Sequence, residues 1–268
     1  MQKRTVTRSE LKTRSNGIVW LPVTFSLGIL VWYLLVWAGD LRPFILPTPD
    51  LVFSRFIRAL ADGTVWRHGL VTLGEVVPGL MIGALFASSL GYLLAKSKRL
   101  ERLLSPYIVA SQSVPTVAIA PLLVIWFGPG ITSKILICAL IVFFPILINT
   151  IVGIRSIPRD LIDLMRSLKA SKWQTFKFME LPATLPIFLG GLRIGATLSV
   201  IGAVVGEFVG ADRGLGFLIN DARFRFDTAM VFVGVFALVT MALVLHGIVV
   251  LLEKRALVWQ RESNEQNI

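Results

Sequence analysis

The stretch ILICALIVFFPILINTIVGI, residues 135–154, contains no charged side chain and is flanked by Lys134 and Arg155. Asn149 is among its few polar residues. A helix needs about 20 mainly apolar residues to cross the hydrocarbon core of a bilayer. The stretch therefore predicts a membrane-spanning helix.

Five other segments of the chain have a similar length and apolar character. Together with the first they give six predicted spans, at residues 17–38, 68–95, 103–129, 135–154, 181–206 and 228–252. Hydrophobic residues make up 55% of the 268 residues and charged residues only 16%, whereas a soluble domain carries about 25% charged residues. This composition excludes a soluble enzyme, a disordered chain and a coiled coil, and it predicts an all-α integral membrane protein with six transmembrane helices.

The span at 17–38 follows five basic residues, as the apolar segment of a signal peptide would. Its 22 residues exceed the roughly 7–15 residues of a signal-peptide core, and no small-residue cleavage site follows it. We therefore expect a retained helix.

Lysine and arginine are distributed unequally between the two sets of loops. Of the 27, 18 fall in the termini and in the loops at 96–102 and 155–180, 8 fall in the alternate loops, and Arg193 lies within a span. The positive-inside rule then predicts that both termini and the 155–180 loop are cytoplasmic. The chain divides into a cytoplasmic tail (1–16), a transmembrane domain (17–252) and a second cytoplasmic tail (253–268). Topology also explains the net charge of +11 without a nucleic-acid partner.

Catalytic and metal-binding motifs are missing from the sequence. Cys138 is the one cysteine and there are two histidines, which excludes an internal disulfide and a multi-cysteine metal site. The run GPGITSK, residues 128–134, has Ser133 where a nucleotide-binding loop needs its second glycine. We expect no catalytic residue, no metal site and no ATP hydrolysis by this polypeptide alone.

Small and polar residues inside the spans admit two interpretations. Glycine and alanine recur every fourth residue from Gly79 to Gly91 and from Gly202 to Gly210, and such strips let helices approach closely within one subunit or between two. Gln112, Asn149 and Glu207 are candidates for lining a substrate path, although such groups also serve to hold helices together. Glu207 is expected at the outer boundary of its span, within reach of water.

The loop at 155–180 is far longer than a turn between two spans requires. Apolar residues at helical spacing predict an amphipathic helix that begins after Pro158, and a second amphipathic segment covers 173–179. A helical hairpin of this kind lies either on the membrane surface or in a groove of a partner protein.

The same loop resembles the EAA loop of the membrane subunits of ABC importers, whose pattern is E-A-A-x3-G-x9-I-x-L-P. Residues 163–165 take the E-A-A positions, Lys169 the glycine, Met179 the isoleucine, and residues 181–182 the closing L-P. The agreement extends from about residue 46 to residue 252, through LPTPDLV, IAPLLVIWFGPGITSKI, FFPILINTIVGI, ELPATLPIFLGGLRIG and VVGEFVGADRGLGFLI. These stretches are similar to permeases of the nitrate, sulfonate and taurine group.

The resemblance implies a type I ABC importer permease in the bacterial cytoplasmic (inner) membrane. Two copies would form the pathway through the lipid bilayer, two copies of a separate ABC ATPase would bind ATP, and an extracytoplasmic solute-binding protein would deliver the solute. This chain would bind no cofactor. ATPase coupling falls on Leu161, Asp163, Leu164, Met165, Leu168, Lys169, Ala170 and Ser171.

Lys169 stands where the EAA pattern has a glycine, at the turn that follows the first helix of the 155–180 loop. A left-handed conformation costs an L-residue roughly 1–2 kcal/mol, so either the turn is built differently here or packing against the ATPase offsets the strain.

Several alternatives stay open at this point. IAPLLVIWFG and GEFVGADRGLG resemble members that handle riboflavin or a thiamine pyrimidine precursor, but nitrate, bicarbonate, taurine and sulfonates are alternatives. A heterodimer with a related permease is the alternative to a homodimer. An ion-coupled secondary carrier and a membrane scaffold are the rival classes, although internal repeats typical of such carriers are not evident.

Overall fold

Twelve helical segments run through the part of the chain that the computed structural model describes, which is residues 8–257, with side chains from residue 22 onward. They are α1 (Arg8–Ala38), α2 (Pro49–Ala61), α3 (Thr64–Lys96), α4 (Lys98–Gln112), α5 (Thr116–Phe127), α6 (Ile131–Arg155), α7 (Arg159–Ser167), α8 (Lys172–Thr175), the π-helix η1 (Phe176–Glu180), α9 (Leu181–Gly210), α10 (Leu215–Phe224) and α11 (Thr228–Ala256). Between residues 8 and 257 there is no strand. The predicted all-α class is confirmed.

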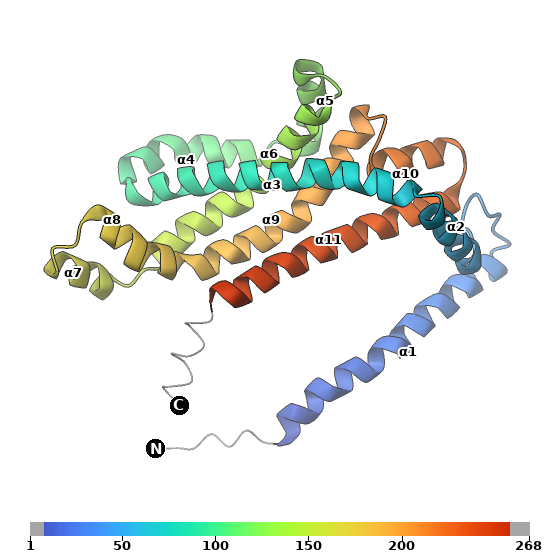
Figure 1. The fold of residues 1–268 in the computed structure, drawn as a ribbon, viewed down its shortest axis with the longest axis horizontal. Coiled ribbons are helices and arrows are strands. Elements are labelled where there is room, and N and C mark those ends of the chain that lie inside the picture. Colours follow the sequence, from blue (N-terminus) through green and yellow to red (C-terminus); the bar gives the residue numbers. More distant parts are fainter. Residues whose placement is uncertain (1–7, 258–268) are drawn as a thin grey trace.

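The centre of the molecule is the packing of α3, α6 and α9, with α11 alongside (Figure 1). Glycines on α3 and α9 flank α6 from two sides. A Cβ on Gly79 would lie 2.3 Å from Cys138 Cβ, and one on Gly202 would lie 2.8 Å from Cys138 Cα. Both glycine strips are therefore used for close helix packing inside one subunit.

Four helical stretches among the described residues are long and apolar enough to cross a membrane: Thr64–Lys96, Ile131–Arg155, Lys172–Gly210 and Thr228–Ala256. The predicted single span at 103–129 is different, because it consists of α4 and α5, which meet at an angle of 94°. Pro115 explains the break, since proline disfavours a helical conformation in the residue before it and has no amide hydrogen to donate. Counting the bent pair gives up to five spans, and the predicted span at 17–38 falls within α1.

Helix α1 stands apart from the bundle (Figure 1). Its carboxyl-terminal end is anchored by Trp32, whose Nε1 donates to Pro47 O at 3.0 Å and whose ring lies 5.0 Å from the ring of Phe232. Apolar side chains along α1 are largely exposed, with Phe25 at 72% and Trp37 at 82%. The part of this helix whose side chains the structure describes, residues 22–38, is therefore left largely uncovered by the other described residues.

The two ends of the molecule are built from different segments. In Figure 1, α7 and α8 lie at the same end as the beginning of α1 and the end of α11, whereas α2 and α10 lie at the opposite end. The 155–180 loop therefore shares an end of the molecule with both ends of the described chain.

Candidate functional site

Helix α7 and the residue that follows it present an apolar stripe that the described residues leave largely uncovered. None of its residues is buried, and Leu161, Leu164 and Leu168 are 41%, 51% and 67% exposed. Its opposite face is polar, with an ion pair between Arg166 and Asp163 at 3.1 Å. An exposed stripe of this kind on a short helix is suited to a groove on another protein.

The turn after α7 keeps the left-handed conformation that the family builds with glycine. Lys169 has φ of 50°. The amide of Ala170 donates to Met165 O at 3.0 Å and that of Lys169 to Arg166 O at 2.9 Å, which is the Schellman pattern of helix termination. The turn is therefore not built differently at the lysine. The other alternative, that packing against the ATPase offsets its strain, stays a prediction.

A capping box starts the next helix directly after this turn. Ser171 Oγ accepts from the amide of Gln174 at 3.2 Å, and Gln174 Oε1 accepts from the amide of Ser171 at 2.7 Å. Because α7 ends at its C-cap Leu168 and the next helix is capped at Ser171, only Lys169 and Ala170 connect the two caps, and the connection has little conformational freedom. This connection, residues 168–171, therefore restricts how α7 can move relative to α8.

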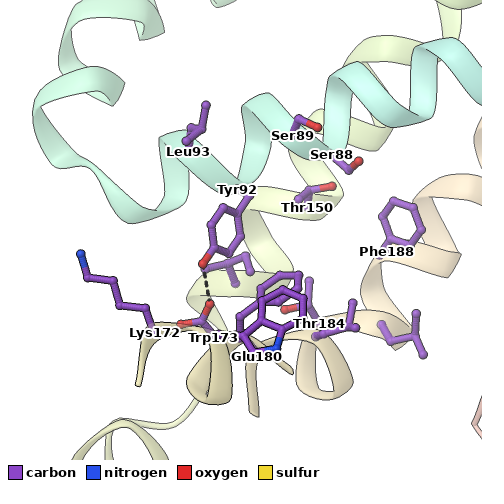
Figure 2. Close-up of a pocket in the computed structure, with 14 residues that line it drawn as sticks. Ser88, Ser89, Tyr92, Leu93, Thr150, Lys172, Trp173, Glu180, Thr184 and Phe188 are labelled. Carbon is purple, nitrogen blue, oxygen red and sulfur yellow. Dashed lines mark hydrogen bonds between the residues drawn. The ribbon is translucent and has the colours of Figure 1, made fainter. Parts of the chain in front are cut away.

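A buried glutamate fastens the end of this loop to α3. Glu180 is 2% exposed and lies in η1, a π-helical turn of a type that is often found at functional sites. Its carboxylate accepts a hydrogen bond from Tyr92 Oη at 2.9 Å and forms an ion pair with Lys96, and Figure 2 shows the Tyr92 contact. Sequence reasoning missed Glu180, although an acidic residue directly before the closing L-P, at a membrane boundary rich in cations, was an available signal.

The beginning of the loop is tied down as well. Arg155, the last residue of α6, lies with Nη2 2.5 Å from Oε2 of Glu101 in α4. Both groups are partly exposed, so this ion pair contributes little stability by itself. Together with Glu180, it fixes both ends of the loop while α7 stays free on its outer side.

The three candidates for a substrate path lie in different surroundings. Gln112 is exposed at the end of α4. Asn149 Nδ2 donates to Pro145 O at 2.8 Å, and a Cβ on Gly191 would lie 2.7 Å from Asn149 Cβ, so this side chain sits between α6 and α9.

Glu207 is not at a wet boundary, contrary to the expectation from sequence. It is 1% exposed, and it accepts hydrogen bonds from Thr72 Oγ1 at 2.7 Å, from Phe217 N at 3.3 Å and from Gly216 N. The free amides at the start of α10 attract a carboxylate. The burial follows, because the chain folds α10 back over the end of α9.

Arg193, the basic residue that lies within a predicted span, has a partner on a neighbouring helix. Arg193 of α9 forms an ion pair with Glu253 of α11. It does not contact Glu75, which is 2% exposed near the other end of α3. This ion pair joins α9 to α11, while the buried Nε of Arg193 has no hydrogen-bond partner among the described residues.

These features define a class: a membrane protein with several spans that exposes a short amphipathic helix, closed by a Schellman turn, at one end of the molecule. A family model described as "binding-protein-dependent transport system inner membrane component" matches residues 79–258. The chain belongs to this family of ABC importer permeases, as the sequence resemblance indicated. It is a transport subunit of the inner membrane and not an enzyme.

Several relatives extend over nearly the whole chain. A riboflavin transport system permease protein of Chloroflexus aurantiacus is 45% identical over 240 residues, covering 90% of both chains. A formylaminopyrimidine transport permease protein of Halalkalibacterium halodurans is 36% identical over 246 residues, covering 90% of this chain and 96% of the relative. A taurine transport system permease protein of Escherichia coli is 32% identical over 250 residues, covering 90% of this chain and 91% of the relative.

Solved structures agree in fold. The MetNI methionine ABC transporter in an inward-facing conformation contains a chain that aligns with a TM-score of 0.61 at 21% identity, covering 70% of this chain and 93% of that one. An amino acid ABC transporter aligns with a TM-score of 0.58 at 18% identity, covering 75% of this chain and 98% of that one. At these identities the likeness concerns the fold alone.

Proposed function

We propose that two copies of this chain form the membrane pathway of an importer that is powered by two copies of a separate ATPase. ATP would be bound by that partner, and an extracytoplasmic binding protein would supply the solute. The observation that carries the proposal is the coupling helix α7, whose apolar stripe is exposed while the 155–180 loop that contains it is tied to α4 by Arg155 and to α3 by Glu180. A helix held in this way can transmit the movement of a partner to α9.

The two glycine strips do not supply the contact between the two copies, because they are used within one subunit. The exposed apolar face of α1 supports another route to self-association. Because lipid tails are as apolar as these side chains, a second copy would bind this face through close helix packing and not through a gain in hydrophobic burial. A heterodimer with a related permease would use the same face.

Both termini and the 155–180 loop, which we call the coupling loop, would lie in the cytoplasm. The excess of lysine and arginine in these segments supports this orientation, and so does the common end of the molecule that α7 shares with both ends of the described chain (Figure 1). Single cysteines at Lys172 and Asp221, in a Cys138→Ser background, should label from opposite sides with an impermeant reagent. Labelling of both from outside would refute the orientation.

For the solute we propose riboflavin or a related uncharged heteroaromatic compound. The support is the relative of 45% identity, whose name specifies riboflavin, ahead of a pyrimidine permease at 36%. Sulfonates and taurine are the alternative, since relatives at 32–34% identity carry those names.

The experiment is riboflavin uptake by cells that need external riboflavin to grow. This permease should restore growth only when its ATPase and its binding protein are produced with it. Growth without the ATPase would favour an ion-coupled carrier, and no riboflavin uptake alongside taurine uptake by the same three proteins would overturn the proposed solute.

A further inference from the structure

A cavity of about 710 Å³ lies between the coupling loop and the bundle, at the end of the molecule that carries α7. Its walls come from α3, α6, α8, η1 and the beginning of α9 (Figure 2). Sites for small molecules have volumes of about 300–1,000 Å³ and are mainly apolar, with a few placed polar groups. The cavity fits that description in size and position.

Aromatic side chains from four elements line this cavity. They are Tyr92 of α3, Trp173 of α8, Phe176 of η1 and Phe188 of α9. The rings of Trp173 and Phe176 are stacked at 5.7 Å and 29°, and Phe176 meets Tyr92 edge-on at 5.5 Å. In Figure 2, Tyr92 and Phe188 stand on opposite sides of the cavity. Walls of this kind offer ring faces and ring edges to a flat aromatic ligand.

Two charged side chains line the cavity, Lys172 and Glu180. Lys172 is exposed, and in Figure 2 its ammonium group points away from the other labelled residues. The carboxylate of Glu180 is engaged by Tyr92 and Lys96. A ligand with a negative charge would meet this carboxylate, and a ligand with a positive charge would compete with Lys96. The cavity therefore favours an uncharged ligand.

One buried hydroxyl of the lining is left without a partner among the described residues. It belongs to Thr184, a residue that is 6% exposed. Its methyl group packs at Gly153, where an added Cβ would lie 2.5 Å away. In contrast, Ser88 and Thr150 donate to Leu85 O and Ile146 O. A buried hydroxyl without a partner is rare in native proteins and marks a place where a ligand atom can bind.

We propose that this cavity is a binding site for an uncharged, planar heteroaromatic ring, and that the imported solute occupies it from the cytoplasmic side. The proposal rests on the proposed function for the identity of that solute. A ring in this position would touch α3 and α6 on one side and α8 and η1 on the other. Because it would brace the coupling loop against the bundle, accumulated solute would slow the ATP-driven cycle.

The test uses the complete complex of permease and ATPase in lipid nanodiscs, without binding protein, and riboflavin as the probe in equilibrium dialysis. We expect saturable binding and a fall in ATPase rate over the same concentration range. Thr184→Val removes the hydroxyl at nearly constant shape and should weaken binding roughly fivefold, the value of one hydrogen bond. Thr184→Ser keeps the hydroxyl and should bind within about twofold of the unmodified complex.

Two further comparisons isolate the aromatic wall and the ring. Trp173→Ala should weaken binding roughly tenfold, because a stacking partner is lost. Trp126→Ala is the matched control, since this tryptophan is exposed on α5 and does not line the cavity. Ribitol, which has the side chain of riboflavin without its ring, should not compete. Each variant is first checked for assembly with the ATPase.

The outcomes separate the site from the proposed solute. If riboflavin is imported normally but does not bind the complex from the cytoplasmic side, or binds equally well to Thr184→Val and Trp173→Ala, the site is refuted and the proposed function stands. If riboflavin binds with the expected dependence on Thr184 and Trp173 but is not imported, the site is supported and the solute is wrong.

Discussion

The two ends of α9 are attached to α3 in different ways. Each end carries a buried glutamate that ties a neighbouring short segment to α3: Glu180 contacts Tyr92 and Lys96, and Glu207 contacts Thr72. At the first end the donors are side chains. At the second end they include backbone amides of α10.

The short helices beside these glutamates differ in burial. Helix α10 has five buried residues, Leu215, Gly216, Leu218, Ile219 and Ala222, whereas α7 has none. Helix α10 is therefore a part of the fold that completes its own core. Among the described residues, helix α7 is connected to the bundle mainly through its two ends, which is the arrangement expected of a surface that another protein completes.

The largest expected effect comes from placing charge on the exposed stripe of α7. Replacing Leu164 and Met165 together by Asp should weaken ATPase binding at least about 100-fold, because two carboxylates would be desolvated in an apolar groove. Co-purification of the ATPase and riboflavin uptake should both be lost.

Ser167→Asp is the control for this variant, because it adds a charge to α7 without removing an apolar anchor, and it should leave both measurements nearly unchanged. Normal ATPase recovery in the double variant, at equal permease levels, would mean that α7 only rests on the membrane surface.

The next largest effect is expected at the other end of α9, where Gly214 packs against Glu207. Gly214 has φ of 112°, and a Cβ there would lie 2.2 Å from the carboxylate carbon of Glu207. Gly214→Ala should therefore destabilise the permease by about 2–4 kcal/mol through backbone strain and overpacking. The measurement is the thermal unfolding midpoint in detergent.

Gly190→Ala is the matched control, since no atom lies within 4 Å of a Cβ at that position in α9. It should not lower the midpoint. Equal midpoints for the two variants would show that the contact between Glu207 and α10 contributes little to stability.

The difference between the two ends also explains what sequence could predict. Helix α7 was predictable because its signals are local: Pro158 before it, apolar spacing within it and the family turn at Lys169 after it. The bond between Glu180 and Tyr92 joins residues 88 positions apart, and no local pattern records such a pair.

The break in the predicted span at 103–129 had a local signal in Pro115. Mean hydropathy does not record it, because the value is averaged over many residues and one interrupted helical turn hardly changes the average. The proline content of a span does not decide the outcome either, because Pro78 and Pro145 lie inside α3 and α6 without ending them. The burial of Glu207 depends on α10 folding back, which is again a long-range event.

A smaller effect is expected when the fastening of the coupling loop is weakened without removing α7. Glu180→Gln loses the ion pair with Lys96 and retains a hydrogen-bond acceptor for Tyr92. Because Lys96 is partly exposed, the loss is moderated by solvent, and we expect uptake per ATP hydrolysed to fall roughly fivefold. ATPase co-purification should be unchanged. Loss of co-purification would assign Glu180 to docking instead of to coupling.

The smallest expected effect is at the turn itself, and it has the opposite sign. Lys169 holds a left-handed conformation at φ of 50°, which costs an L-residue about 1–2 kcal/mol. Glycine removes that cost but gives back about 0.5–1 kcal/mol in unfolded-chain entropy, so Lys169→Gly should stabilise the turn by up to about 1 kcal/mol. Hydrogen exchange at the amides of Lys169 and Ala170, which close the Schellman pattern, should slow up to roughly fivefold, with uptake retained.

Lys169→Val is the discriminating variant, because a β-branched residue is the least compatible with positive φ. Its amides should exchange faster than those of the unmodified chain, and faster exchange in the glycine variant would mean that contacts of the lysine side chain stabilise this turn more than its backbone strain costs.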